Sequence, residues 1–155
     1  MKIVSCQNIP AMQSLVSEQF SEFSAPVAIT QQDIDAFAAL SGDHYWLHTD
    51  PDRCRRESPF GTTIAHGQLI QAIQSRFTLP LDYQIEGYVS LRNYGCDKTR
   101  FVKPVPVGSE LCMRARIAKV DTHNQGTLVT FDMHMHIKGD ASPCFIQQLL
   151  TLYCF

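Results

Sequence analysis

The sequence lacks the features that mark membrane, secreted and nucleic-acid-binding proteins. No apolar run approaches the roughly 18 residues that a membrane-spanning helix needs. Residues 1–8 lack the apolar stretch of a secretory signal. The 13 lysines and arginines do not outnumber the 15 acidic residues, so there is no basic excess to favour nucleic acid. We therefore expect a cytoplasmic protein that binds neither membrane nor nucleic acid.

The cysteines do not form a disulfide or zinc framework either. No two of the six stand in a C-x-x-C pair, and their spacings are wide and irregular. They are Cys6, Cys54, Cys96, Cys112, Cys144 and Cys154. Because 45% of the residues are hydrophobic, the chain can build an ordinary core without cross-links. We expect reduced thiols, mostly buried in strands, and no metal site.

The 155 residues fit one domain, spanning 1–155, and the first half of the chain reads as helical. A short helix is predicted over about 9–17, and a brief strand over 27–29. Thr30 is a good N-cap with Asp33 in the reciprocal capping position, so a second helix begins there. Gly42 ends it, as glycine does at a left-handed C-terminal position. Asp43 therefore follows a helix end, where the backbone turns sharply.

A further helix is predicted over about 64–77, after a short one that begins at Asp50-Pro51. Its apolar side chains keep the 3.6-residue period of one buried face. They are Leu69, Ile70, Ile73 and Phe77. This helix contains no acidic residue, and Pro80 ends it.

From Gln84 onward the hydrophobic period changes to two, which predicts strands. Alternation over 111–118, 129–137 and 144–154, with turns at 123–126 and 139–140, indicates an antiparallel meander. Its apolar face needs a partner, and the helix at 64–77 is the only sizeable candidate. The predicted fold class is therefore α+β, with one helix packed on a curved antiparallel sheet.

The opposite face of the strand at 129–137 carries polar side chains. His134 and His136 superficially suggest metal ligands. Because Asp132 and Lys138 share their face, we expect a solvated surface or the rim of a dimer interface.

Two short segments stand out as carriers of chemistry. They are Ser41-Gly42-Asp43-His44-Tyr45-Trp46-Leu47-His48 and Phe60-Gly61-Thr62-Thr63-Ile64-Ala65-His66-Gly67. In order and spacing they resemble the motifs of MaoC-like (R)-specific enoyl-CoA hydratases, most closely those of the nodulation-protein-N-like branch. The similarity to that branch continues further along the chain. It includes Asn93-Tyr94-Gly95, Lys98, Arg100-Phe101 and residues 104–108. The resemblance therefore spans nearly the whole chain.

This resemblance implies a hot-dog fold, in which a long central helix is wrapped by an antiparallel sheet, and a homodimer formed through continuous sheet contacts. It implies hydration of a trans-2-enoyl thioester, or dehydration of the (R)-3-hydroxyacyl thioester. Asp43 and His48 match the pair that brackets the catalytic water. The backbone N–H of Gly67, at a helix start, would bind the thioester oxygen. No cofactor is implied, because coenzyme A or the phosphopantetheine of an acyl-carrier protein is part of the substrate.

Such a reaction needs a base for the water, a proton for the thioester Cα and donors for the enolate-like oxygen. We expect Asp43 to accept the water's proton, and His48 to hold the water and deliver a proton to Cα. Either residue alone would more often be structural: a loop carboxylate that caps N–H groups, or a hydrogen-bonding histidine. The two motifs together favour catalysis.

The chain departs from the hydratase motif at one place. The family has Asn-Pro two and three residues after the Asp, where this chain has Tyr45-Trp46. This change bears on efficiency and substrate choice. Trp46 either covers the active-site loop or fills the core.

Further residues are weaker candidates for substrate binding. His66 is predicted to act at the helix start or behind the site, and Ile70 to be core that also lines an acyl tunnel. Lys98, Arg100 and Lys103 either meet the phosphates of coenzyme A or are solvated. The complete set of candidates is Tyr45, Trp46, His66, Ile70, Asn93, Lys98 and Arg100.

Two other functions stay open at this stage. A hot-dog thioesterase would usually take a carboxylate from the central helix, and 64–77 offers none. A non-catalytic acyl-thioester-binding protein would keep the fold and lose turnover. The presence of both Asp43 and His48 disfavours that reading.

Overall fold

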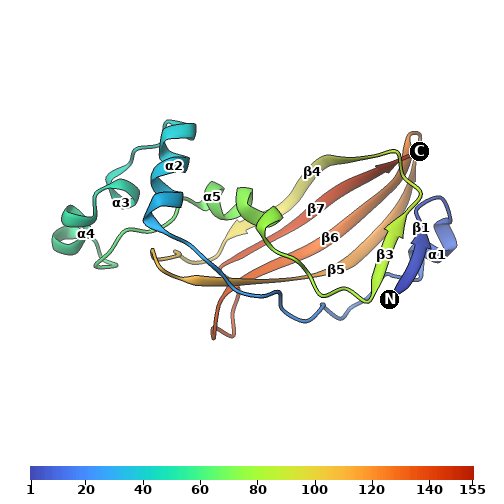
Figure 1. Cartoon of the computed structure of the whole chain (residues 1–155), viewed down its shortest axis with the longest axis horizontal. Helices are drawn as coiled ribbons and strands as arrows, with labels where there is room; N and C mark the ends of the chain where they lie inside the picture. Colours follow the sequence, from blue (N-terminus) through green and yellow to red (C-terminus); the bar gives the residue numbers. More distant parts are fainter.

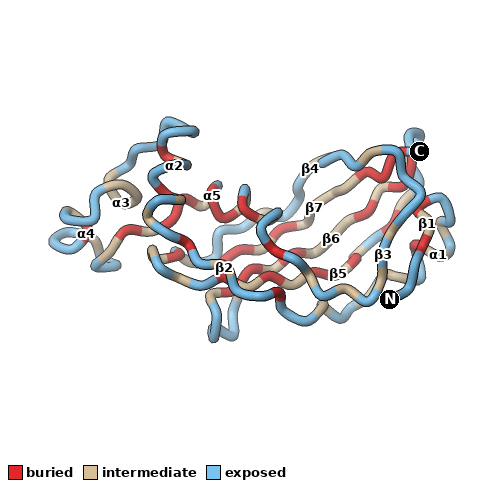
Figure 2. The backbone as a smooth tube through the Cα atoms, viewed as in Figure 1, coloured by how far each residue is buried: buried red, intermediate tan, exposed pale blue.

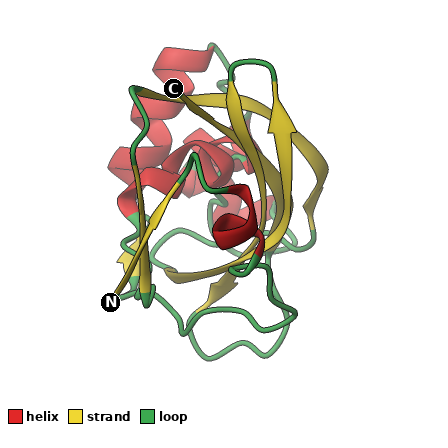
Figure 3. Cartoon of the chain, turned by 90° about the vertical axis from the view of Figure 1, so that its right-hand side faces the viewer, coloured by secondary structure: helices red, strands yellow, loops and turns green.

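A curled five-stranded antiparallel sheet dominates the structure (Figure 1), a computed structural model that describes all 155 residues. The strand order is β2-β5-β6-β7-β4. The bounds are β2 (Val27–Ala28), β4 (Ser90–Phe101), β5 (Glu110–His123), β6 (Gly126–Ile137) and β7 (Phe145–Cys154). The predicted meander of three strands is confirmed as β5-β6-β7. Figure 3 shows how strongly these strands curve.

A second, two-stranded sheet was not predicted from the sequence. It pairs β1 (Lys2–Ser5) in parallel with β3 (Tyr83–Glu86). Neither strand has room for a long alternation, and parallel pairing joins segments far apart in the chain, so local periodicity did not reveal it.

The helices lie in the first half of the chain, as predicted. They are α1 (Ile9–Gln13), α2 (Gln31–Ser41), α3 (Trp46–Thr49), α4 (Pro51–Glu57) and α5 (Gly67–Ala72), and α5 continues into the 3-10 helix η1 (Ile73–Arg76). The Thr30 side chain accepts from the Asp33 N–H, and the Asp33 carboxylate accepts from the Thr30 N–H, so the predicted capping box begins α2. Gly42 ends it with φ +81°, in the left-handed conformation. No helix is long and apolar enough to cross a membrane.

The central helix is shorter than the predicted range 64–77. It begins at Gly67 because the N–H groups of the two residues before His66 bond to distant parts of the chain. The Ile64 N–H donates to the Leu47 carbonyl at 3.0 Å, and the Ala65 N–H donates to the Val105 carbonyl at 2.8 Å. These are long-range bonds, which the apolar period cannot indicate.

The core lies between this helix and the concave face of the sheet, where Figure 2 shows the buried backbone. Ile70, which is 2% exposed, packs in one cluster with side chains of the sheet. The other members from the helix and sheet include Leu69, Ile73, Phe77, Leu111, Met113, Met133, Met135 and Phe145. The α+β hot-dog arrangement predicted from the sequence is therefore confirmed in the fold.

The prediction of a solvated surface around His134 and His136 is wrong. The segment 17–24 runs along the edge of β5, with the Ser21 and Ser24 N–H groups donating to β5 carbonyls at 2.8 Å. It carries Phe20 onto His134 and Phe23 onto His136, with ring centroids 4.4 and 5.0 Å apart.

As a result His136 is only 2% exposed. Arg114 adds its guanidinium to the same cluster, 4.9 Å from the centre of the Phe20 ring. Segment 17–24 has no helical or strand period, so nothing local showed that it would cover this face.

This covered histidine pair predicts acid sensitivity. Burial, and secondarily the charge of Arg114, lowers the pKa of both His134 and His136 below their usual value of about 6.5. The unfolded chain therefore takes up protons first as the pH falls, and we expect the free energy of unfolding to decrease below about pH 6.5. Urea midpoints at several pH values would measure this. The double variant His134→Gln/His136→Gln should lose part of the pH dependence, whereas His44→Gln, at an exposed position, should keep it. An unchanged slope in the double variant would contradict this origin.

Candidate active site

Asp43 stands in the loop that follows α2, where Gly42 reverses the direction of the chain. The Asp43 N–H donates to Ser41 Oγ at 3.2 Å, and Asp43 Oδ1 accepts from the Tyr45 N–H at 3.2 Å. One carboxylate oxygen thus caps an N–H group of the loop, which is the structural role that a loop carboxylate often has. The other oxygen is open to a ligand, because no further hydrogen bond to the Asp43 side chain is formed and the residue is exposed.

His48 lies on the short helix α3, and its tautomer is set by a backbone contact. Its Nδ1 is 2.7 Å from the carbonyl oxygen of Ile64. Because a carbonyl can only accept, Nδ1 carries the proton. In the neutral ring Nε2 then holds the lone pair. His48 therefore offers a hydrogen-bond acceptor, or a base, to a water molecule.

His66 joins the two motifs that the sequence singled out. It is the N-cap residue of α5 and is 1% exposed. Its Nε2 donates to the main-chain carbonyl of Asp43 at 2.9 Å. Its ring also stacks on His48, with centroids 3.8 Å apart and planes 25° apart. The buried imidazole thus holds both predicted catalytic residues, which agrees with its predicted place at the helix start and behind the site.

Asp43, His48 and His66 form one cluster, in which carboxylate and imidazole ligand atoms lie within 4.8 Å of one another. A metal ion would have to lie in the plane of each imidazole that binds it. The two ring planes are nearly parallel and do not converge on one ion, and one nitrogen of each ring already bonds to a carbonyl. We interpret the cluster as one that positions water and protons.

A cavity of about 300 Å³ opens beside His48. Gly67 and Ile70 of α5 line it, as do Phe101 of β4 and Phe145 of β7. Gly67 is the first residue of the helix, so its N–H has no partner within the helix. A Cβ at Gly67 would lie 2.9 Å from the Phe101 ring, so only glycine fits here without displacement. The structure thus brings His48, Gly67 and Ile70 around one space. Asp43 does not line this space, but its carboxylate lies within 4.8 Å of the His48 ring.

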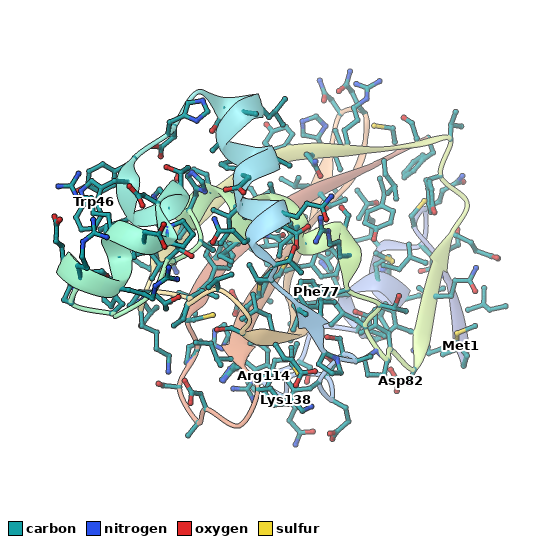
Figure 4. The ribbon with its side chains drawn as sticks, turned by 60° about the vertical axis from the view of Figure 1, so that its left-hand side comes forward. Met1, Trp46, Phe77, Asp82, Arg114 and Lys138 are labelled. Atoms are coloured by element: carbon teal, nitrogen blue, oxygen red, sulfur yellow. The ribbon has the colours of Figure 1, made fainter.

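Tyr45 and Trp46 stand outside this cavity. Tyr45 is 53% exposed, and its ring lies edge-on to His48 at 6.1 Å. Trp46 packs under the guanidinium of Arg53 at 4.2 Å. Figure 4 shows it on the outer side of the helical layer. Trp46 is half-buried and is not a member of either core cluster, so the core-filling alternative is wrong.

None of the β4 residues that were predicted to bind substrate lines the cavity at His48. Lys98 and Arg100 are exposed and do not line the cavity. Lys98 sits at an irregularity of the strand with φ +49°. Of the three basic candidates only Lys103 reaches the lining, where it pairs with Asp140 at 2.6 Å.

Asn93 lines a separate cavity. Phe101, the ring against Gly67, was not among the predicted site residues. The only sequence signal for it was its place in the Arg100-Phe101 motif.

Comparison with known proteins agrees with this geometry. Residues 14–136 match the family described as the MaoC like domain. This chain belongs to that family. It is 37% identical over 128 residues to 3-hydroxyacyl-thioester dehydratase Z of Mycobacterium tuberculosis, covering 82% of this chain and 83% of the relative. It is 32% identical over 130 residues to Nodulation protein N of Rhizobium leguminosarum, covering 83% and 81%.

Solved structures of two hydratases share the fold. An R-hydratase from Pseudomonas aeruginosa superposes with a TM-score of 0.68 at 21% identity, covering 88% of this chain and 80% of that one. The (R)-hydratase from A. caviae gives a TM-score of 0.63 at 19% identity, covering 88% and 97%. At these identities the likeness concerns the fold.

The contact between Gly67 and Phe101 yields a prediction for this MaoC-family protein. Gly67→Ala would push its methyl group into the Phe101 ring, and we expect a loss of about 1–3 kcal/mol of unfolding free energy. In a Phe101→Leu background the same change should lower the unfolding free energy by less, because the ring atoms that the alanine methyl group would meet are gone. Denaturant midpoints of the four proteins measure this coupling.

Gly95→Ala is the matched control, since a Cβ there meets nothing within 4 Å. If Gly67→Ala lowered the free energy of unfolding equally in the wild-type and Phe101→Leu proteins, the Phe101 ring would not be what opposes a side chain at position 67.

Proposed function

We propose that this protein adds water reversibly to trans-2-enoyl thioesters, forming (R)-3-hydroxyacyl thioesters. The observation that carries the proposal is the close approach of Asp43 to His48, which lines a cavity together with Gly67 at the start of α5. Membership of the MaoC-like family and the similarity to 3-hydroxyacyl-thioester dehydratase Z support it.

In the proposed reaction one water molecule lies between Asp43 and His48. Both groups present acceptors, the Asp43 carboxylate and the lone pair on His48 Nε2. As the water oxygen bonds to the Cβ of the enoyl group, its proton passes to this pair and is then delivered to Cα. The water therefore supplies both the hydroxyl and the hydrogen, and the atoms balance. Because the two groups share one water, the proton belongs to the pair rather than to one residue.

The thioester oxygen gains negative charge while Cβ is attacked. We assign its stabilisation to the Gly67 N–H, which is unpaired within the helix and borders the cavity. Without a Cβ, Gly67 lets the thioester approach the backbone closely. Coenzyme A or carrier-protein phosphopantetheine would enter as part of the substrate, and the reaction requires no other cofactor.

The structure bears on the two alternative functions. No acidic residue occurs in α5 or η1, so the carboxylate that a hot-dog thioesterase would take from this helix has no source here. A binding protein without turnover would be favoured if Tyr45 or Trp46 filled the space beside His48. Neither residue lines that cavity, which favours the enzyme.

The activity test follows the loss of the conjugated thioester absorbance when purified protein meets a short 2-enoyl-CoA. We expect Asp43→Asn and His48→Ala to lower kcat by about 100-fold or more, the usual contribution of proton transfer by positioned groups. His44→Ala is the matched control, because His44 is exposed and outside the cluster. Wild-type activity in Asp43→Asn would refute the assigned site, and thiol release in place of hydration would point to a thioesterase.

We also propose a homodimer joined through β4. The segment 17–24 covers the edge of β5, while β4 pairs only with β7 and leaves its other edge open along 12 residues. An edge of this length invites pairing with a second strand. Exposed apolar side chains along it, Leu91, Tyr94 and Phe101, favour a protein partner over water.

Sedimentation should accordingly give twice the chain mass. Leu91→Lys should shift the equilibrium toward the monomer. Leu40→Lys should not, because Leu40 is exposed on α2, away from β4. A wild-type monomer at all concentrations would refute the dimer.

A further inference from the structure

The side-chain amide of Gln31, the first residue of α2, connects three parts of the chain around His48. Gln31 Nε2 donates to the main-chain carbonyl of His48 at 2.8 Å and to Asp35 Oδ1 at 2.9 Å. Thr63 Oγ1 donates to Gln31 Oε1. One half-buried amide therefore joins α2 to α3 and to the segment that leads into α5.

The orientation of this amide is decided by its partners. The His48 carbonyl and the Asp35 carboxylate can only accept, so the amide nitrogen must face them. The amide oxygen then faces Thr63, whose hydroxyl donates to it. A carboxylate in place of the amide would lose both donors and would bring a negative charge against two acceptors.

The His48 carbonyl has no partner within its own helix. The helix α3 has only four residues, and His48 is in its last turn, where the carbonyls lack an N–H of the same helix to accept from. Gln31 supplies the missing donor. His48 is therefore held at two points, its main chain by Gln31 and its ring by the Ile64 carbonyl.

Both supports of Gln31 are fixed in the fold. Gln31 follows the N-cap Thr30, and Asp33 of the same capping box pairs with Arg76 of η1 at 2.8 Å. The Arg76 guanidinium and the Thr30 N–H lower the pKa of the Asp33 carboxyl to about 2, so this ion pair persists at neutral pH. On the other side Thr63 is only 1% exposed. The position of the amide is thus set by the body of the protein, and α3 is attached to it.

We propose that Gln31, together with Thr63, is a positioning residue for His48, fixing the main chain of α3 so that the imidazole stays at the cavity. This inference rests on the proposed hydration reaction and adds the group that holds His48 in place. Neither Gln31 nor Thr63 lines the cavity, so neither is expected to touch the substrate. Because a misplacement of about 1 Å can lower a rate about 100-fold, a small shift of α3 is enough to slow turnover.

The test replaces Gln31 by glutamate, which keeps the size of the side chain and removes its donors. An acid in the first turn of a helix is normally favourable, so a residue that served α2 alone would tolerate Gln31→Glu without loss of stability or activity. We expect instead that kcat for a short 2-enoyl-CoA falls about ten- to 100-fold. KM should change little, because no contact with the substrate is removed.

Thr63 gives an independent pair of variants. Thr63→Val removes the hydroxyl and leaves Gln31 Oε1 without its donor, so kcat should fall in the same direction. Thr63→Ser keeps the hydroxyl and should keep kcat close to the wild-type value. Denaturant midpoints of all variants show whether each one is folded under the assay conditions.

Gln32→Glu is the matched control, since Gln32 is the next residue of α2, is exposed and lies outside the cavity. The same change of charge there should leave kcat unaltered. Wild-type kcat in Gln31→Glu, or an equal loss in Gln32→Glu, would overturn the positioning role and leave the proposed function standing. Absence of hydration by the wild-type protein would overturn the proposed function, and with it this role of Gln31.

Discussion

The stacked imidazoles of His48 and His66 are the contact on which the site depends. His66 is buried at the start of α5, and its Nε2 holds the backbone of Asp43. His48 lies against its ring and is oriented in turn by the Ile64 carbonyl. The loop after α2 and the approach to α5 are thereby fixed to each other. Without this contact the Asp43 carboxylate would sit on an exposed loop with only local hydrogen bonds to place it.

The same helix start connects the proposed catalytic pair to the sheet. Gly67 packs closely against Phe101, so that a Cβ at this position would displace the ring, and both residues line the cavity. From there α5 runs along β7, past an apolar space and then a glutamine-lined one. One short helix therefore supplies the proposed oxyanion donor, Gly67, and part of the wall of the cavity beside His48. Its brevity is compensated by packing, since Ile70 is almost completely buried.

Features set by neighbours in the chain were predictable. The capping box at Thr30, the left-handed Gly42 and the alternating strands of the meander are each written in a few consecutive residues. The pairing of the Asp43 and His66 motifs could be expected only through the resemblance to a known family. Sequence reasoning missed the β1–β3 pair and the true start of the central helix, because bonds to residues far along the chain decide both.

The sequence by itself determined the α+β fold class, because periodicity and caps are local properties. Its motifs indicated the residues of the proposed chemistry through their resemblance to a known family. Only the tertiary structure decided which side chains share a space. It placed Phe101 rather than Lys98 or Arg100 at the cavity, and it buried His136 beneath Phe23. It also joined three glutamines, from α5, η1 and β7, by hydrogen bonds between their side chains. Such groupings depend on how the sheet curls around α5, which brings together residues that no spacing along the chain connects.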